Sequence, residues 1–251
     1  MNTLVVKRRG SFGLGIVTVV ILAVLLGLGV WQLQRRTQKH LLIAALTERL
    51  AGTPQPLPAR AVWPTLSPET DEFRRVTFTA TYAAKPDAMV YSSGSAVRTD
   101  ISGPVTWAFL PALLADGATV VINAGAVQNT MQDRAQQDRA VQRLVTGAPV
   151  TLTGYLRFPE AAGALTPNDD VAKRLWFTRD QRAMAEALRW GDVAPFYIDL
   201  ESPAPPSGIP KPGPLEVQLK DDHMQYAVTW FGLAVAVLVA FGVWLKGQRR
   251  A

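Results

Sequence analysis

Residues 16–31 read Ile-Val-Thr-Val-Val-Ile-Leu-Ala-Val-Leu-Leu-Gly-Leu-Gly-Val-Trp, and they form the centre of a longer stretch without formal charge. That stretch runs for 25 residues, from Gly10 to Gln34. A helix needs about 20 consecutive apolar residues to cross the hydrocarbon core of a bilayer. The stretch has no polar face of the kind that a surface helix shows. We therefore expect a transmembrane helix over residues 10–33.

A second uncharged stretch of 23 residues extends from His223 to Leu245 near the end of the chain. Tryptophans lie near the ends of both stretches, as is typical of the aromatic belts at the membrane surface. The first stretch could instead belong to a signal peptide, but it is longer than such apolar segments and no small-residue cleavage site follows it. We expect a second transmembrane helix over residues 223–245.

The formal net charge of +6 lies entirely at the two ends of the chain. Three basic residues precede the first stretch and three follow the second, without any acidic residue: Lys7, Arg8, Arg9, Lys246, Arg249 and Arg250. Positive flanks stay in the cytoplasm, whereas long domains translocate largely regardless of their charge. We thus expect cytoplasmic tails at residues 1–9 and 246–251 and an extracytoplasmic (periplasmic) domain at 34–222. This charge pattern does not indicate binding to nucleic acid.

The first tail has only nine residues, which leaves no room for a mitochondrial presequence. We therefore expect a multi-pass protein of the bacterial cytoplasmic (inner) membrane, with both termini in the cytoplasm and the lipid bilayer as a partner.

The segment between the two stretches has the pattern of a β-rich domain. Residues 75–82 and 150–158 alternate apolar and polar side chains, which indicates half-buried strands. Further strands are expected at 89–91, 107–110, 120–122, 196–200 and 215–219, and helices at 35–50, 134–144 and 179–190. Proline-rich segments at 51–70 and 203–214 are typical of extended connectors. The predicted fold class is an α+β membrane protein, in which two transmembrane helices flank a mainly antiparallel β domain with about two helices.

Catalytic signatures are missing from the sequence. The chain has no cysteine and only two histidines, His40 and His223. These counts exclude thiolate catalysis, iron–sulfur ligation and a three-histidine metal site within one chain. No nucleophile elbow, zinc-protease motif or phosphate-binding loop is present. We expect no catalytic residue, no resident metal site and no enzymatic activity.

Small residues recur every four positions in the second stretch, at Gly232, Ala236 and Ala240. Small residues at this spacing let helices approach closely in a membrane. We expect either the first helix or a partner protein to pack against this face.

Several segments resemble the Surfeit-locus (Surf/Shy) family of cytochrome c oxidase assembly proteins. Residues 221–231, Asp-Asp-His-Met-Gln-Tyr-Ala-Val-Thr-Trp-Phe, resemble that family's "N-N-H-x-Q-Y-A-x-T-W-F" opening of the last span. Residues 28–39 resemble its "LGxWQxxRxxxK" at the end of the first span. Residues 73–82, 150–160, 165–170, 176–180 and 194–199 also match family segments, so the resemblance covers nearly the whole chain in order.

The resemblance implies an assembly factor for haem–copper terminal oxidase that handles haem a or inserts it into the catalytic subunit. It implies that His223 is an axial haem ligand, which agrees with imidazole as a common ligand of haem iron. Arg35, Arg36 and Lys39 would then hold the anionic propionates, and Tyr226 and Trp230 would pack against the porphyrin.

The implied partners are the oxidase catalytic subunit and haem a synthase. His40 is a weaker candidate for a second ligand. The alternative is a scaffold that stabilises oxidase subunits without binding haem.

The sequence departs from the family pattern at residues 122–127. The family shows "VNRGWV" where this chain has Ile-Asn-Ala-Gly-Ala-Val, so Ala124 and Ala126 replace an arginine and a tryptophan. A partner contact that uses those two side chains would be altered here.

Overall fold

The structure is a computed structural model that describes residues 4–95, 97–128, 134–216 and 221–248. It divides into two compact units. The helical unit comprises Met1–Ala44 and Leu219–Ala251, and the sheet unit comprises Ala45–Gln218. Arg249 and Arg250 lie outside the described residues.

Helix α1 (Leu4–Ala51) contains both the first apolar stretch and the polar helix expected after it. No proline interrupts these residues, and proline inside a helix would remove a backbone hydrogen bond. The helix ends at Ala51, and the N–H of the next residue, Gly52, donates to the carbonyl of Arg49 at 3.4 Å. Pro54 and Pro56 follow and prevent the helix from continuing.

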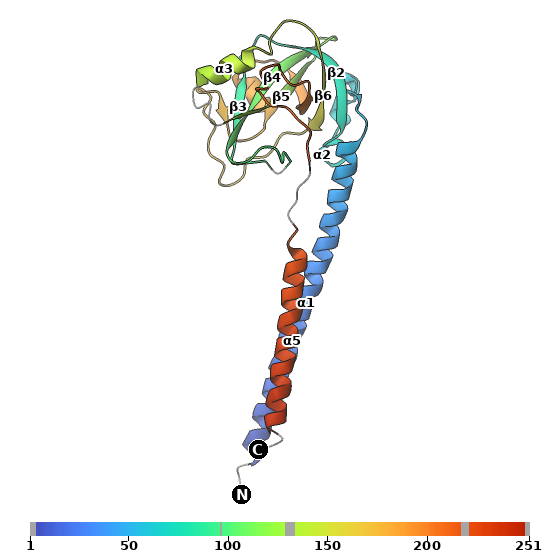
Figure 1. The fold of residues 1–251 in the computed structure, drawn as a ribbon, viewed down its shortest axis with the longest axis vertical. Coiled ribbons are helices and arrows are strands. Elements are labelled where there is room, and N and C mark those ends of the chain that lie inside the picture. The colour runs from blue at the N-terminus through green and yellow to red at the C-terminus, as the bar shows by residue number, and fades with distance from the viewer. Residues whose placement is uncertain (1–3, 96, 129–133, 217–220, 249–251) are drawn as a thin grey trace. The chain divides into compact units, whose positions relative to one another are not determined.

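Helix α5 (His223–Gln248) begins at the predicted residue and runs beside α1 within the helical unit (Figure 1). Both helices are long and apolar enough to cross a membrane. Large apolar side chains point outward from both of them. Val19 is 65% exposed on α1 and Val243 is 67% exposed on α5. The two long apolar helices expected at the ends of the chain are thereby confirmed.

The sheet unit contains one sheet of eight strands among its described residues, in the order β1-β2-β6-β8-β5-β4-β3-β7. The strands are β1 (Gln55–Pro56), β2 (Arg75–Tyr82), β3 (Ala88–Ser92), β4 (Val105–Leu114), β5 (Thr119–Gln128), β6 (Val150–Arg157), β7 (Leu175–Trp176) and β8 (Val193–Ser202). Short helical elements lie between them: η1 (Arg60–Thr65), α2 (Pro68–Asp71), α3 (Arg134–Gln142) and α4 (Gln181–Ala187).

An additional pairing between β2 and β4 closes five of these strands into a ring. Ala80 of β2 pairs with Leu114 of β4, while residues 75–80 of β2 pair with β6 on the other edge. The ring therefore runs β2-β6-β8-β5-β4 and returns to β2. Closure removes the free edges of these strands, which otherwise invite pairing with other chains.

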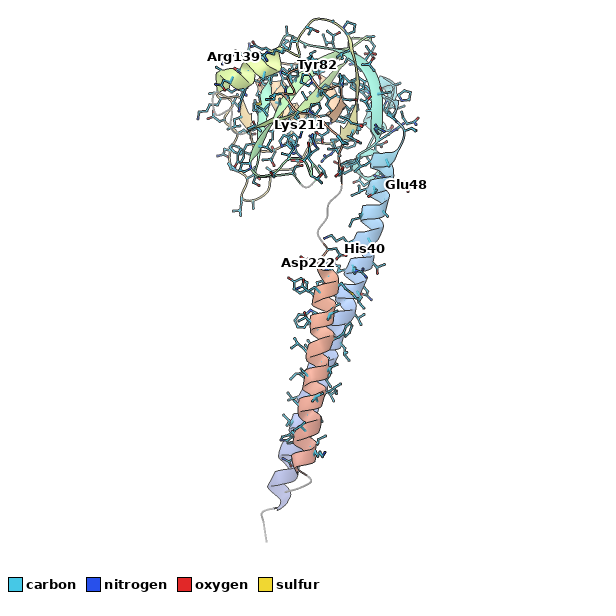
Figure 2. The ribbon with its side chains drawn as sticks, viewed as in Figure 1. His40, Glu48, Tyr82, Arg139, Lys211 and Asp222 are labelled. Atoms are coloured by element: carbon cyan, nitrogen blue, oxygen red, sulfur yellow. The ribbon has the colours of Figure 1, made fainter. Side chains whose placement is uncertain are left out.

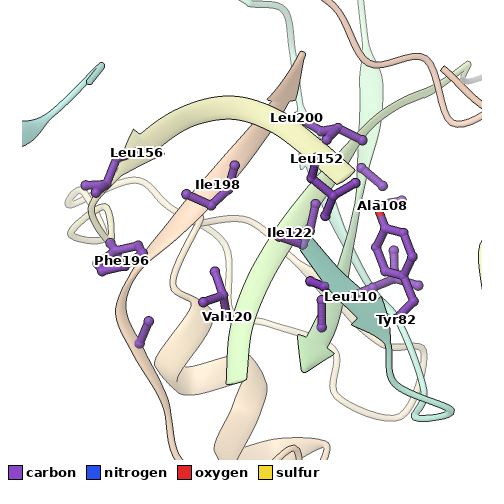
Figure 3. Close-up of a cluster of buried hydrophobic side chains, with 14 of the residues drawn as sticks. Tyr82, Ala108, Leu110, Val120, Ile122, Leu152, Leu156, Phe196, Ile198 and Leu200 are labelled. Atoms are coloured by element: carbon purple, nitrogen blue, oxygen red, sulfur yellow. The ribbon is translucent and has the colours of Figure 1, made fainter. Parts of the chain in front are cut away.

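The inward-facing residues of the ring form the main hydrophobic core (Figure 3). Alternate side chains point to one face because successive residues of a strand face opposite sides. The core includes Leu110, Ile122, Leu152, Leu156, Phe196 and Ile198, each at most 1% exposed. The ring of Trp63 in η1 packs against Phe196 edge to face, with centroids 5.3 Å apart.

A second cluster covers the outer face of strands β3, β4, β5 and β8. It combines strand residues such as Trp107 and Tyr197 with Met184 and Ala185 of α4. Asp180 caps α4, because its carboxylate accepts hydrogen bonds from the N–H groups of Arg182 and Ala183 at 2.9 and 3.1 Å. Such a cap satisfies N–H groups that have no partner within the helix.

The sheet is mixed, which corrects the prediction of a mainly antiparallel domain. β5 runs parallel to β8, β1 to β2 and β3 to β7. Apolar alternation shows that a segment is a strand but does not encode the direction of its neighbour. Two further expectations were wrong: the segment 51–70 contains β1, η1 and α2, and residues 215–216 form no strand. The remainder of the strand expected at 215–219 lies outside the described residues.

Candidate functional site

The candidate site lies in the helical unit, where the beginning of α5 meets α1. His223 is the first residue of α5, and its backbone N–H donates to Oδ1 of Asp221 at 3.1 Å. A carboxylate in this place satisfies a free N–H and interacts favourably with the positive end of the helix dipole. Asp221, two residues earlier in the sequence, therefore restrains the backbone that carries the His223 imidazole.

The His223 ring is held from the other helix. Its Nδ1 lies 2.8 Å from Oε1 of Gln32 on α1. Gln32 is a polar residue near the end of the apolar stretch, and it is only 9% exposed. A buried amide requires a partner, because an unpaired buried polar group is costly. No residue that the structure describes forms a hydrogen bond with the other ring nitrogen, Nε2.

Asp221 connects the start of α5 to α1 a second time. Its Oδ2 lies 2.6 Å from Nε2 of His40 and 3.7 Å from Nε of Arg36. Partial burial raises the pKa of Asp221, but the hydrogen bonds from the His223 N–H and from His40 outweigh that effect, so the pKa lies below its ordinary value. Figure 2 shows His40 level with Asp222, next to the first turn of α5. His40 therefore contacts the carboxylate rather than the His223 ring.

The basic residues expected to hold propionates lie on the same part of α1. Arg35 donates to Oε1 of Gln38 at 3.2 Å and lies over the ring of Trp31, 5.9 Å from its centroid. Arg36 is shared with Asp221, as described above, and Lys39 is partly buried. The structure thus brings the three basic residues close to the helix junction, with part of the Arg36 charge already balanced.

The aromatic residues expected beside the site follow His223 along α5. Tyr226 is 54% exposed, and Trp230 is partly buried with an indole N–H that finds no partner among the described residues. Positions 223, 226 and 230 share one helix face, because residues three, four and seven apart lie above one another. The arrangement offers a ring nitrogen and two aromatic surfaces on one side of α5.

The contact between the helices does not use the small-residue face that the sequence indicated. Gly232, Ala236 and Ala240 are exposed. Ala227 and Ala234, by contrast, are 1% and 2% exposed. The expectation that α1 covers the small-residue face was therefore wrong, and a partner on that face stays a prediction.

Gly29 of α1 marks the point of close approach. A Cβ added to Gly29 would lie 2.6 Å from the ring of Phe231 on α5, which is closer than van der Waals contact allows. The absence of a side chain at position 29 therefore permits the observed packing of the two helices.

The helix junction offers one imidazole, that of His223, as a donor to the iron of a haem. No group of three or more histidines and carboxylates that could hold a metal ion occurs among the described residues. An imidazole whose Nδ1 is engaged and whose Nε2 has no hydrogen-bond partner in the described chain matches the requirement of an axial ligand.

Sequence reasoning assigned no role to Gln32 or Asp221. The signals were present, since Gln32 is a polar residue at the end of an uncharged stretch and Asp221 precedes the predicted ligand by two positions. The pairing itself joins residues 191 positions apart and had no local signature.

The replaced family positions in β5 are buried in this chain. Ala124 and Ala126 are each 1% exposed, and they belong to the inner and outer clusters of the sheet unit. Between them, Gly125 has φ +119°, and a Cβ there would lie 2.3 Å from the backbone of Lys211. At both alanine positions the side chain packs in the interior of the domain and does not form a surface.

The chain belongs to a class of proteins in which two apolar helices precede and follow one mixed-sheet domain in the sequence. In this chain the two helices meet at His223, Gln32 and Asp221. The sequence profile of the SURF1 family matches residues 19–235. The chain belongs to this family.

The similarity to individual relatives covers most of the chain. Surfeit locus protein 1 of Rattus norvegicus is 30% identical over 220 residues, which is 84% of this chain and 68% of the rat protein. Surfeit locus protein 1 of Takifugu rubripes is 28% identical over 84% of this chain and 88% of the fish protein. The human Surfeit locus protein 1 is 29% identical over 84% of this chain and 70% of its own length.

Proposed function

We propose that this protein is an assembly factor for haem–copper terminal oxidase (cytochrome c oxidase) that handles haem a or inserts it into the catalytic subunit. Family membership supports the assembly role, and the helix junction supports the part played by haem. In this role the chain delivers a group to another protein and needs no catalytic residue of its own.

The observation that carries the haem proposal is the state of His223. Its Nδ1 is engaged with Gln32, and its Nε2 has no hydrogen-bond partner among the described residues. Haem a would supply the iron that accepts an imidazole nitrogen as an axial ligand. Tyr226 and Trp230 would offer apolar surface on the same helix face.

The basic residues of α1 would bind the propionates. A guanidinium can form charge-assisted bonds with a carboxylate, and these are stronger than neutral ones. Arg35 contacts only a neutral amide and an aromatic ring in the interactions described above, so it is the best placed of the three. Arg36 would have to be shared with Asp221, and Lys39 would assist from the next turn.

We propose a location in a bacterial cytoplasmic membrane, with both termini in the cytoplasm and the sheet unit on the outer side. The basic residues before the first apolar stretch and after the second support this orientation through the positive-inside rule. The oxidase catalytic subunit and haem a synthase are the proposed protein partners.

Haem absorbance of the purified full chain in detergent tests the proposal. We expect His223→Ala to weaken haem binding about tenfold or more and to alter the ligation spectrum, because the iron loses its ligand. His40→Ala removes the other histidine of the chain and serves as the matched control, with binding retained. A His223→Ala protein with the full Soret band and an unchanged spectrum would contradict the haem role.

A scaffold that binds oxidase subunits without haem is the second candidate. The exposed small-residue face of α5 favours it, because helices in a membrane approach closely at such faces and α1 does not cover this one. Co-purification with the oxidase catalytic subunit separates the two roles. A scaffold keeps this subunit after His223→Ala and loses it after Ala236→Leu.

A further inference from the structure

The hydrogen bond between Gln32 and His223 has a consequence for the chemistry of the histidine. A neutral imidazole carries one proton, on either Nδ1 or Nε2. The atom of Gln32 that faces Nδ1 at 2.8 Å is the carbonyl oxygen Oε1, which only accepts hydrogen bonds. The proton must therefore reside on Nδ1, and the lone pair on Nε2.

The surroundings of this pair hold it in place. Gln32 is 9% exposed and is carried by a helix that contacts α5 again at Gly29 and Phe231. Asp221 restrains the backbone of His223 by accepting a hydrogen bond from its N–H. The ring is thus restrained at its backbone and at Nδ1, while Nε2 lies on the far side of the ring from Gln32.

We propose that Gln32 is a positioning residue for the haem ligand. It holds His223 in the tautomer that has its lone pair on Nε2 and fixes the direction of that nitrogen. In metal sites, a partner on the second ring nitrogen sets the tautomer and orientation of the ligating histidine. The proposal rests on the proposed function for its meaning, but the tautomer can be measured without haem.

Three variants separate positioning from simple packing. Gln32→Leu keeps the approximate volume and removes the acceptor. Gln32→Glu keeps an acceptor at the same place. Gln34→Leu is the matched control, because it changes the same residue type at an exposed position two residues further along α1. Circular dichroism and size-exclusion chromatography of the full chain in detergent show whether each variant folds.

The first measurement is nitrogen NMR of histidine-labelled protein without haem. The chain has only two histidines, so His40→Gln assigns the signals. We expect His223 to be the Nδ1–H tautomer in the parent, in Gln32→Glu and in Gln34→Leu. Gln32→Leu should shift it to the mixture of a free imidazole. An Nε2–H tautomer in the parent, or no change in Gln32→Leu, would overturn the proposal.

The second measurement is haem binding by the same proteins. Loss of a partner of a metal ligand typically reduces affinity about 10–100-fold, so Gln32→Leu should bind haem that much more weakly. Rescue by Gln32→Glu, with Gln34→Leu unchanged, is the signature of an acceptor rather than of packing. If the parent binds no haem through His223, the proposed function fails while NMR still decides the role of Gln32. If binding depends on His223 but not on Gln32, only the positioning role fails.

Discussion

At the scale of single residues, Asp221 combines two tasks through its two oxygens. Oδ1 accepts from the backbone N–H of His223, and Oδ2 lies next to His40 and Arg36 of α1. One carboxylate thus caps the N-terminus of α5 and connects it to α1. Because these partners favour its charged form, its pKa lies below its ordinary value.

The lowered pKa of Asp221 predicts a pH-dependent contribution to stability. A carboxylate with a lower pKa in the folded state stabilises that state fully above its unfolded pKa, and loses this effect as the pH falls through the folded pKa. We expect Asp221→Asn to lower the thermal unfolding midpoint at pH 7. The difference from the parent should shrink below about pH 4 as the unfolded-state carboxyl is protonated.

Thermal unfolding of the full chain in detergent at a series of pH values checks this expectation. Asp192→Asn is the control, because Asp192 is exposed in the sheet unit. Its difference from the parent should be small at every pH. A difference for Asp221→Asn that stays constant from pH 7 to pH 3 would show that the charge of Asp221 is not its source.

At the scale of elements, the contact between α1 and α5 depends on small side chains at the point of closest approach. Gly29 lies against the ring of Phe231, while Ala227 and Ala234 are buried on α5. In lipid, apolar side chains gain little from leaving their surroundings, so close packing is a major source of helix association. The position of Gln32 relative to His223 therefore depends on this contact.

Gly29→Leu should disrupt the helix pair. The added side chain meets the ring of Phe231, and overpacking of this kind costs about 1–3 kcal/mol. Gly27→Leu is a matched control, because a Cβ at Gly27 has no atom within 4 Å. Both changes increase helix propensity equally, so the difference between them isolates packing.

Chemical unfolding of the two variants in detergent measures this difference. Adding Phe231→Ala should recover part of the loss in Gly29→Leu, because the double variant makes room for the new side chain. Equal stability of Gly29→Leu and Gly27→Leu would show that the helices do not depend on close approach at position 29.

The strands were predictable where a local period marks them. Residues 75–82 coincide with β2, and residues 150–157 with β6, because period-two alternation is a property of neighbouring residues. The two-residue strands β1 and β7 are too short to show any period. Strands β5 and β8, which pair in parallel, are far apart in the sequence, since β5 ends at Gln128 and β8 begins at Val193. No local pattern could therefore reveal their pairing.

In the candidate site, too, some residues have a local sequence signal and others do not. His223 was predictable because it lies in a specific motif at the start of an apolar stretch. Its partner Gln32 was not, since a hydrogen bond between two helices depends on their rotation about their axes. The burial of Ala124 follows from the closed strand ring, whose core contains it, and the burial of Ala126 follows from the outer cluster that includes residues of α4.

At the scale of the whole molecule, charge is concentrated where it determines topology. The chain carries a formal net charge of +6, and the three basic residues before the first apolar stretch and the three after the second account for it. The residues between these two groups are neutral overall, but Arg35, Arg36 and Lys39 directly follow the first apolar stretch. Because long domains translocate largely regardless of their charge, the short tails decide the orientation. The proposed orientation therefore depends on two short basic tails.

The chain offers a direct test of this orientation because it has no cysteine. A single cysteine placed at Ala162, which is exposed in the sheet unit, should react with a membrane-impermeant maleimide in intact bacterial spheroplasts. A single cysteine placed at Gln248, the last residue of α5, should react only after the membrane is permeabilised. The unsubstituted chain is the control for background labelling. Labelling of both sites in intact spheroplasts would contradict the positive-inside argument, because the end of α5 would then lie outside as well. The reverse order of accessibility would also contradict it, and would place the haem site proposed at the start of α5 on the cytoplasmic side.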